Sequence, residues 1–126
     1  MEFITVFFLG AALYGSIEVL FRGWTHWTML ILGGICFCLM YMLSGTSLPF
    51  VLKLLLSALC ITALEFGTGY LVNIILGWRV WDYSGNALNV MGQICPLFSF
   101  LWFLLSIPGL ALCSVMHRGM DLLFGA

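Results

Sequence analysis

Four long apolar stretches, separated by short polar segments, constrain the fold of this chain more than any other feature. A helix needs about 20 mostly apolar residues to cross the hydrocarbon core of a bilayer. Hydrophobic residues make up 63% of the 126 positions and charged residues only 7%, whereas soluble domains carry about 25% charged residues. A small globular domain leaves much of its surface in water and could not hide so many apolar side chains. The sequence therefore predicts an integral membrane protein.

The polar breaks divide the chain into four predicted membrane-spanning helices within a single domain, residues 1–126. The first stretch stops at Arg22-Gly23, the second stops at the SGTS segment, and Pro49 suits the start of the third. In the fourth, Pro96 is expected in the first turn and Pro108 is expected to kink the helix. The predicted helices cover approximately residues 3–21, 27–43, 49–77 and 92–116. We expect an all-α four-helix bundle in the membrane.

The pattern Gly-Trp-x-x-Trp occurs twice, as GWTHW at residues 23–27 and as GWRVW at residues 77–81. Each copy follows an apolar run that contains one glutamate, Glu18 in the first and Glu65 in the second. Tryptophan is enriched at membrane–water interfaces, and the first and third helices run in the same direction, so both pairs should lie at one membrane face. The recurrence suggests two repeated helical hairpins related by an axis along the membrane normal. Two aromatic belts that recur by chance are the alternative.

Glu65 is the acid placed deepest in a predicted helix. An acidic residue within a membrane is costly and usually faces a bundle interior or a wet cavity. Gly69, Asn73 and Gly77 follow at a spacing of four residues, so they share one helix face with Glu65. We expect this face to leave room for water or solute between Glu65 and the following turn. Glu65 is either a protonatable or cation-binding site, or a neutral acid satisfied by an interhelical hydrogen bond.

Glu18 lies nearer the end of its helix, with Arg22 one turn later on the same face. Acid and base at this spacing can neutralise each other locally. A structural ion pair is therefore favoured over a binding role for Glu18, although Glu18 stays a candidate contact.

The connection from Trp78 to Met91 is the longest and most polar in the chain. Long ordered loops are often functional, whereas Gly85 and Asn86 also suit a plain surface turn. This loop is predicted to cap a cavity above Glu65, with Asp82 paired to Arg79. The candidate substrate- or ion-binding residues of the whole chain are Glu18, Glu65, Asn73, Trp81, Asp82, Tyr83, Asn89 and Gln93.

Several function classes find no support in the sequence. A net charge of −1 gives no basic footprint for nucleic acid. His26 and His117 are expected at opposite membrane faces, and the five cysteines fall mostly in apolar runs, so neither a metal site nor a cofactor is predicted. The chain has no G-x-x-x-x-G-K-[ST] motif for nucleotide hydrolysis and no G-x-S-x-G motif of a hydrolase.

Three segments are similar to a known family: YGSIEVLFRG at 14–23, HWTMLILGG at 26–34 and VWDYSGNALNVMGQICPLFSFLW at 80–102. The chain resembles the ABC-transporter type IV family of small bacterial membrane proteins, the CmpB-like permeases, over most of its length. The family pattern has intramembrane Glu, a Trp-Asp-Tyr-Ser turn, then Asn and Gly. It falls here on Glu18, Glu65, Trp81, Asp82, Tyr83, Ser84, Asn89, Gly92 and Gln93. The resemblance implies the fold and the membrane placement more than it implies transport, and for a transporter of this family it implies an ATPase partner or an oligomer.

The favoured interpretation is a multi-pass protein of the bacterial cytoplasmic membrane that forms homo-oligomers and handles a small solute or ion as a permease-like subunit. A membrane-embedded enzyme that acts on a lipid is the first alternative, and a non-transporting partner subunit is the second. Two adjacent carboxylates near one membrane face would favour the enzyme. A continuous polar path across an oligomer would favour transport.

Overall fold

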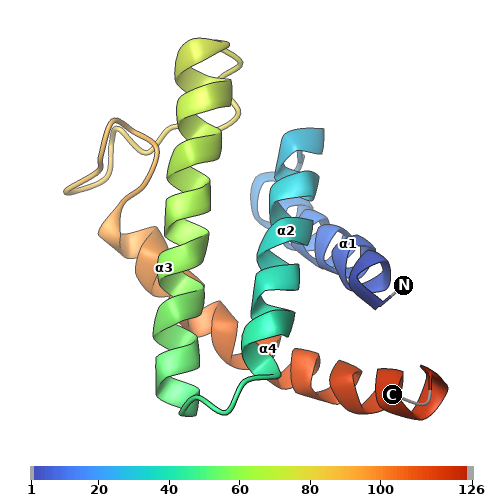
Figure 1. Cartoon of the computed structure of the whole chain (residues 1–126). Coiled ribbons are helices and arrows are strands. Elements are labelled where there is room, and N and C mark those ends of the chain that lie inside the picture. The colour runs from blue at the N-terminus through green and yellow to red at the C-terminus, as the bar shows by residue number, and fades with distance from the viewer. Residues whose placement is uncertain (1, 125–126) are drawn as a thin grey trace.

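The computed structural model describes residues 2–124, and over that range the fold is helical (Figure 1). The α-helices are α1 (Glu2–Arg22), α2 (Trp27–Ser44), α3 (Phe50–Gly69) and α4 (Pro96–Phe124). A short π-helix, η1 (Tyr70–Ile75), continues α3 without a break, so that Phe50–Ile75 is one span of 26 residues. Each of the four spans is long and apolar enough to cross a membrane. The predicted all-α membrane fold is confirmed.

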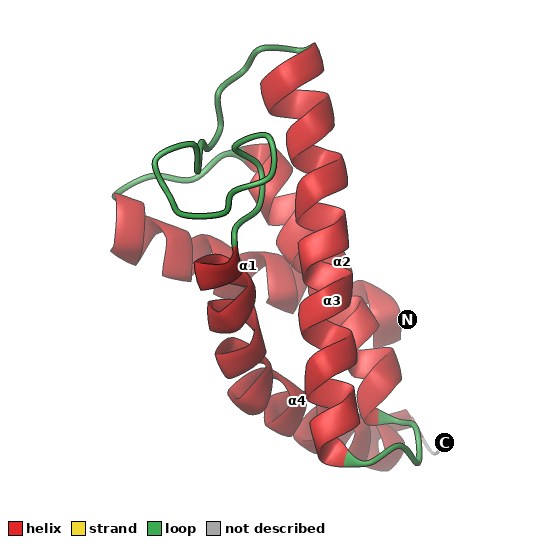
Figure 2. Ribbon diagram, turned by 90° about the vertical axis from the view of Figure 1, so that its left-hand side faces the viewer, coloured by secondary structure: helices red, strands yellow, loops and turns green. Residues whose placement is uncertain are grey.

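The helices pair in chain order, with α1 packed mainly on α2 and α3 mainly on α4. The second helix, α2, also contacts α3 and α4 and therefore lies at the centre of the molecule. α2 and α3 run side by side, whereas α1 crosses them steeply (Figures 1 and 2). α4 changes direction along its length, and Pro108 lies in its interior, where a proline removes a backbone hydrogen bond.

Glycines let α1 and α2 approach closely. A methyl group on Gly33 would lie 2.6 Å from the Cβ atom of Tyr14, and one on Gly34 would lie 2.8 Å from the backbone oxygen of Phe7. Small residues at a helix crossing allow close packing inside a membrane, where the hydrophobic effect does not drive helices together. The α1–α2 hairpin is therefore held by backbone proximity.

The two Gly-Trp-x-x-Trp segments begin alike and then diverge. Gly23 and Gly77 both have a positive φ, +81° and +68°, a conformation that glycine adopts freely as a helix ends. The last residue of the first copy, Trp27, begins α2. The last residue of the second copy, Trp81, is buried in the core. The rings of Trp27 and Trp78 lie 5.8 Å apart, so the ends of α1 and α3 lie at the same side of the molecule.

The structure corrects the ends of two predicted helices. The third span ends at Ile75 rather than at residue 77, because Gly77 has a positive φ. The fourth begins at Pro96 rather than at residue 92, because Gly92 also has a positive φ and Val90 forms an isolated bridge with Ile94. It continues to Phe124 rather than ending at residue 116.

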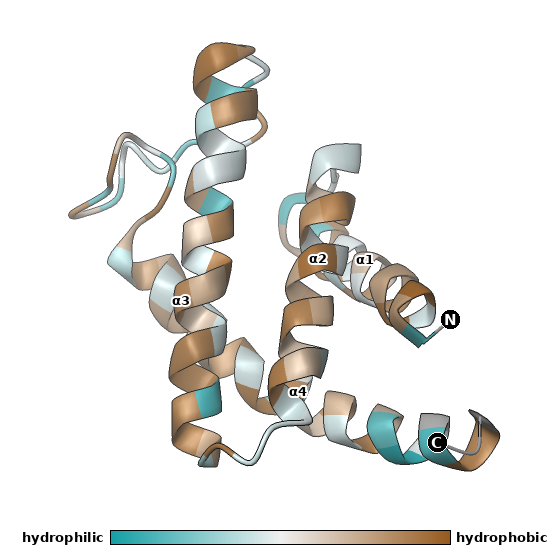
Figure 3. Ribbon diagram, viewed as in Figure 1, coloured by the Kyte–Doolittle hydropathy of each residue, from teal (hydrophilic) through white to brown (hydrophobic). Residues whose placement is uncertain are grey.

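The connection between η1 and α4, residues 76–95, is called the long loop below. It folds back over the molecule beside the start of α4 (Figure 2). Hydrophilic residues gather in this loop and near the end of α4, while the spans are apolar along most of their length (Figure 3). The loop is tied to the first hairpin, because Arg22 Nη2 donates a hydrogen bond of 3.0 Å to the carbonyl oxygen of Val80.

Candidate functional site

Glu65 lies where α3, α4 and the long loop meet, and only 1% of its surface is exposed. The Tyr83 hydroxyl, from the loop, donates a hydrogen bond of 2.9 Å to Oε2. Trp102 Nε1, from α4, donates one of 3.3 Å to Oε1. Three consecutive elements of the chain therefore converge on one carboxyl group, through residues 18 and 37 positions after Glu65.

The partners of Glu65 suit both of its protonation states. An indole N–H can only donate, so Oε1 accepts in either state, while a tyrosine hydroxyl can donate or accept. When the carboxyl is ionised, Tyr83 donates to Oε2; when it is protonated on Oε2, the acid can donate to the hydroxyl oxygen instead. The site can therefore gain or lose a proton without leaving a buried polar group unpaired.

Glu18 has a different environment, although it is also buried. Arg22 Nε lies 3.1 Å from its Oε2, an ion pair whose angle is too bent for a hydrogen bond. The Tyr14 hydroxyl donates a hydrogen bond of 2.7 Å to Oε1. The Tyr14 ring lies 5.9 Å from the Trp102 ring, which connects the surroundings of Glu18 with those of Glu65. Glu18 has a cationic neighbour, whereas Glu65 has none among residues 2–124.

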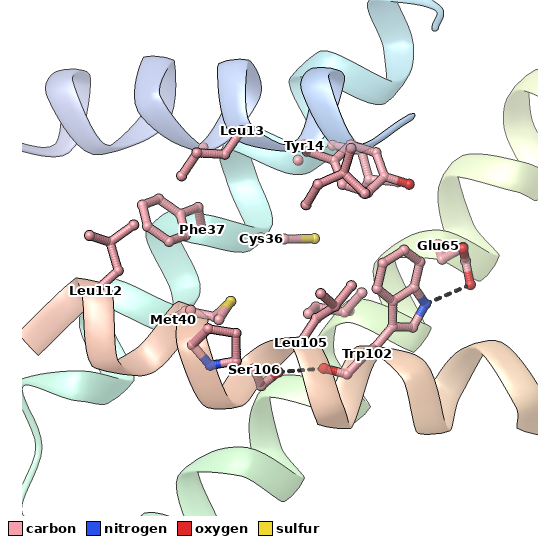
Figure 4. Close-up of a pocket in the computed structure, with 17 residues that line it drawn as sticks. Leu13, Tyr14, Cys36, Phe37, Met40, Glu65, Trp102, Leu105, Ser106 and Leu112 are labelled. Atoms are coloured by element: carbon pink, nitrogen blue, oxygen red, sulfur yellow. Dashed lines mark hydrogen bonds between the residues drawn. The ribbon is translucent and has the colours of Figure 1, made fainter. Parts of the chain in front are cut away.

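A pocket of about 270 Å³ extends from Glu65 between α1, α2 and α4 (Figure 4). Tyr14, Glu65 and Trp102 lie at one end, and Phe37 and Leu112 lie at the other (Figure 4). The Cys36 sulfur points into the space between them (Figure 4). Ser106 also lines the pocket, but its hydroxyl donates to the carbonyl oxygen of Trp102, 2.7 Å away. The pocket is thus apolar along most of its length and polar at the Glu65 end.

Asn73 organises the long loop rather than lining this pocket. Its Oδ1 accepts hydrogen bonds from the backbone N–H of Val80 at 2.7 Å and of Trp81 at 3.4 Å. Its Nδ2 donates to Gln93 Oε1 at 2.8 Å. Trp81 is buried, and its Nε1 donates to the carbonyl oxygen of Gln93 at 3.0 Å.

The expected open space beside Gly69 is filled by protein. A methyl group on Gly69 would lie 2.8 Å from the Trp81 ring, and Gln93 is in contact there as well. The predicted stripe also ends early, because Gly77 lies beyond the last helical residue, Ile75. Both departures have the same cause: the loop folds back onto the face of α3 that carries Gly69 and Asn73, and its side chains occupy that face.

The exposed residues of the loop form local turns. Asp82 Oδ1 accepts a 2.9 Å hydrogen bond from the Ser84 backbone N–H, which lowers the pKa of Asp82, with a smaller contribution from the charge of Arg79. In the part of the chain that the structure describes, Arg79 forms no ion pair, so the predicted Asp82–Arg79 pair is not present at contact distance. Asn89 Nδ2 donates to the carbonyl oxygens of Ser84 and Asn86.

Tyr83 is the loop residue that reaches the pocket acid, and its ring stacks on Phe98 with centroids 4.4 Å apart. Burial raises the pKa of the Tyr83 hydroxyl, and the neighbouring carboxyl of Glu65 raises it further. Tyr83 is therefore a neutral hydrogen-bond donor at physiological pH.

The structure adds three pocket residues to the predicted candidates. Tyr14 lies one helical turn before Glu18, so its spacing could have indicated the contact. Trp102 and Cys36 reach the pocket through packing of helices that are distant in sequence, which no local pattern reveals. No group of three His, Cys, Asp or Glu side chains is placed to hold a metal ion within residues 2–124.

No curated protein and no solved structure matches this chain. A family model does match it, over residues 3–123, which span all four helices and the long loop. The chain therefore belongs to the family described as "Putative ABC-transporter type IV".

Proposed function

We propose that this chain is a permease-like subunit of a transporter in the bacterial cytoplasmic membrane, and that it binds a small solute or ion in the pocket beside Glu65. One observation carries the proposal: an otherwise apolar pocket ends at a buried acid that has only neutral hydrogen-bond donors as partners. Ligand sites are commonly apolar cavities with a few placed polar groups. Intramembrane acids commonly mark substrate or ion pathways.

The sequence motifs and the number of spans indicate which partners this subunit needs. The sequence has no nucleotide-binding motif, so an ATP-driven transporter of this family needs a separate ATPase subunit. Four spans are few for a permease, which supports assembly into a homo-oligomer.

Glu65→Gln tests the proposal, because it keeps the size and hydrogen bonding of the side chain but removes ionisation. We expect the variant to fold while losing pH-dependent binding or flux between about pH 5 and 9, a range that spans shifted carboxyl groups. The other titratable groups around Glu65 are Tyr83 in the loop, Tyr14 and Glu18 in α1, and Cys36 in α2.

A structural acid would behave differently in the same experiment. Glu65→Gln would then be nearly silent, while Glu65→Ala would lower the free energy of unfolding by about 1–3 kcal/mol, because Trp102 Nε1 would lose its acceptor. Unchanged pH-dependent binding in a folded Glu65→Gln protein would contradict the proposal.

An enzyme that acts on a lipid is the second candidate, and one observation favours it. Glu18 and Glu65 are both buried and are linked through Tyr14 and Trp102, which brings two carboxyl groups to the same region. Glu18 forms an ion pair with Arg22 at 3.1 Å, whereas Glu65 has no cationic partner within residues 2–124. Hydrolysis or transfer on a membrane lipid that depends on both Glu18 and Glu65 would replace the transport proposal.

A further inference from the structure

The pocket beside Glu65 has one side that is bordered by partly exposed aliphatic residues. Leu13 and Ile17 of α1 line it and are each 39% exposed, and Leu105 and Leu112 of α4 line it and are 41% and 36% exposed. Exposed side chains on a membrane span contact lipid tails or another protein. The two helices that carry these residues lie on opposite sides of the pocket (Figure 4).

The helices that border this side are joined only weakly. α1 packs on α2, and α4 packs on α2 and α3, but α1 and α4 share no extensive contact of their own. They approach each other at the rings of Tyr14 and Trp102, which is the polar end of the pocket. From that point the space between them is bordered by aliphatic side chains.

The polar end has an uncompensated acid. Glu18 lies beside Arg22, whereas the two partners of Glu65 are a phenol and an indole, both neutral. Within residues 2–124, no Lys or Arg lies within ion-pair distance of Glu65. The charge complement of this end of the pocket is therefore a cation or a group rich in N–H donors.

We propose that the pocket receives a cationic amphiphile from the bilayer, through the side bordered by Leu13 and Ile17 of α1 and Leu105 and Leu112 of α4. The ammonium-type head lies beside Glu65 and Tyr83, and part of the apolar chain lies along the pocket. This inference rests on the proposed function and names its substrate class.

The volume of the pocket agrees with partial enclosure of such a molecule. Drug-sized ligands occupy pockets of about 300–1,000 Å³, and an engineered cavity of about 150 Å³ holds benzene. A pocket of about 270 Å³ can hold a head group and a segment of chain. The rest of the chain can stay among the lipid tails, because the residues that border the pocket on that side are 36–41% exposed.

Photo-crosslinking in phosphatidylcholine vesicles tests the inference. The probes are three long-chain molecules that carry the same diazirine in the chain and differ in the head: a primary amine, an alcohol and a carboxylic acid. We expect the amine to label the peptides of Leu13–Ile17 and Leu105–Leu112 at least about tenfold more than the alcohol, because a hydrogen bond to a charged group exceeds a neutral one. The carboxylic acid should label them least.

Two variants separate the head-group contact from the route. Glu65→Gln should lower labelling by the amine probe to the level of the alcohol probe. Labelling by the alcohol probe should stay the same. Ile17→Trp fills the bilayer-facing side and should lower labelling by both probes while Glu65 is intact. Leu20→Trp is the matched control, because Leu20 lies on the same helix, is 87% exposed and does not line the pocket; it should leave labelling unchanged.

Equal labelling by the amine and the alcohol in the unmodified chain would overturn the inference, as would labelling unaffected by Ile17→Trp. The proposed function is examined separately with methylammonium, a water-soluble amine that has the same charged head but no apolar chain. If methylammonium binds in a manner that requires Glu65 while the long-chain amine does not label the pocket, the inference fails and the proposed function stands. If neither amine depends on Glu65, both fail.

Discussion

Asn73 joins the end of the third span to the long loop through three hydrogen bonds. Replacing it with alanine leaves the N–H of Val80, a residue only 2% exposed, without an acceptor. A buried donor left unpaired costs about 1–3 kcal/mol. We expect Asn73→Ala to lower the free energy of unfolding by that amount, measured by denaturation of the purified protein in mixed micelles.

Asn89→Ala provides the comparison for this prediction. Asn89 also accepts a backbone hydrogen bond, from Gly92, and donates two, but its partners Ser84 and Asn86 lie in the more exposed part of the loop. Water can replace the two bonds to Ser84 and Asn86, so Asn89→Ala leaves one buried donor, the Gly92 N–H, without an acceptor. Asn73→Ala leaves two, the N–H groups of Val80 and Trp81, and should therefore cost more. Equal losses would contradict this account of Asn73.

Asp82 gives the loop a pH dependence with a defined sign. Its pKa in the folded chain is lowered, first by the hydrogen bond from the Ser84 N–H. The stabilisation is therefore present above the ordinary carboxyl pKa and is lost as the pH falls through the lowered value. Asp82→Asn should loosen residues 82–92 near neutral pH but not in strong acid. Limited proteolysis of both chains across this range is the measurement, and a difference that persists in acid would contradict the assignment.

The candidate residues show how far sequence reasoning reaches at this scale. Glu65 can be identified from the sequence as a lone acid in an apolar run, and Tyr83 as part of the polar turn that follows. The structure shows that these two residues form a hydrogen bond. The partner Trp102 could not be found in this way, because it reaches Glu65 only when α4 packs on α3. The position of Trp81 at the end of an apolar run predicts an interfacial residue, but the loop folds back and buries it. Local patterns identify chemical types, whereas tertiary packing decides which of them meet.

Among the elements, the α1–α2 hairpin gives the sharpest prediction. A methyl group on Gly34 would meet the backbone of Phe7, which cannot move aside as a side chain can. We expect Gly34→Ala to destabilise the protein by about 1–3 kcal/mol, the usual cost of overpacking. Gly67→Ala is the matched control, because nothing lies within 4 Å of its added methyl group. The control should be neutral or stabilising, since alanine favours helix, and equal losses in thermal unfolding would exclude steric crowding.

The elements also differ in how well the sequence predicts their ends. α1 and α2 end within one residue of the prediction, because Arg22-Gly23 and the segment after Ser44 interrupt their apolar runs. The sequence predicts the start of α4 four residues too early, at residue 92 instead of Pro96, because Gly92 and Gln93 lie in an apolar context that resembles helix. Their turn depends on a hydrogen bond from the Gly92 N–H to Asn89 Oδ1 and on the positive φ of Gly92. Neither feature has a hydropathy signature.

For the whole molecule, the hairpin arrangement predicts a shared membrane side for two connections. Trp24 and Ser84 follow α1 and the third span, whose ends meet at Trp27 and Trp78, and both side chains are exposed. In a chain with its native cysteines replaced by alanine, Trp24→Cys and Ser84→Cys should react with an impermeant maleimide from the same side. Thr46→Cys, in the connection between α2 and α3, should react only from the other side. Labelling of Trp24→Cys and Ser84→Cys from opposite sides would contradict the four-span topology.

The unequal lengths of α2 and the third span have a consequence for how the protein responds to its membrane. At about 1.5 Å per residue, the 26 residues of Phe50–Ile75 measure about 39 Å and the 18 residues of α2 about 27 Å, against a hydrocarbon core of about 30 Å. Such hydrophobic mismatch is relieved by tilting the longer helix, and a thinner bilayer demands more tilt. The helix that must tilt carries Glu65, while Trp102 belongs to its neighbour, so bilayer thickness acts directly on the contact between them. The length of the lipid chains should therefore change the surroundings of Trp102. The measurement is the fluorescence of Trp102, in a chain whose other tryptophans are replaced, reconstituted in phosphatidylcholines of increasing chain length.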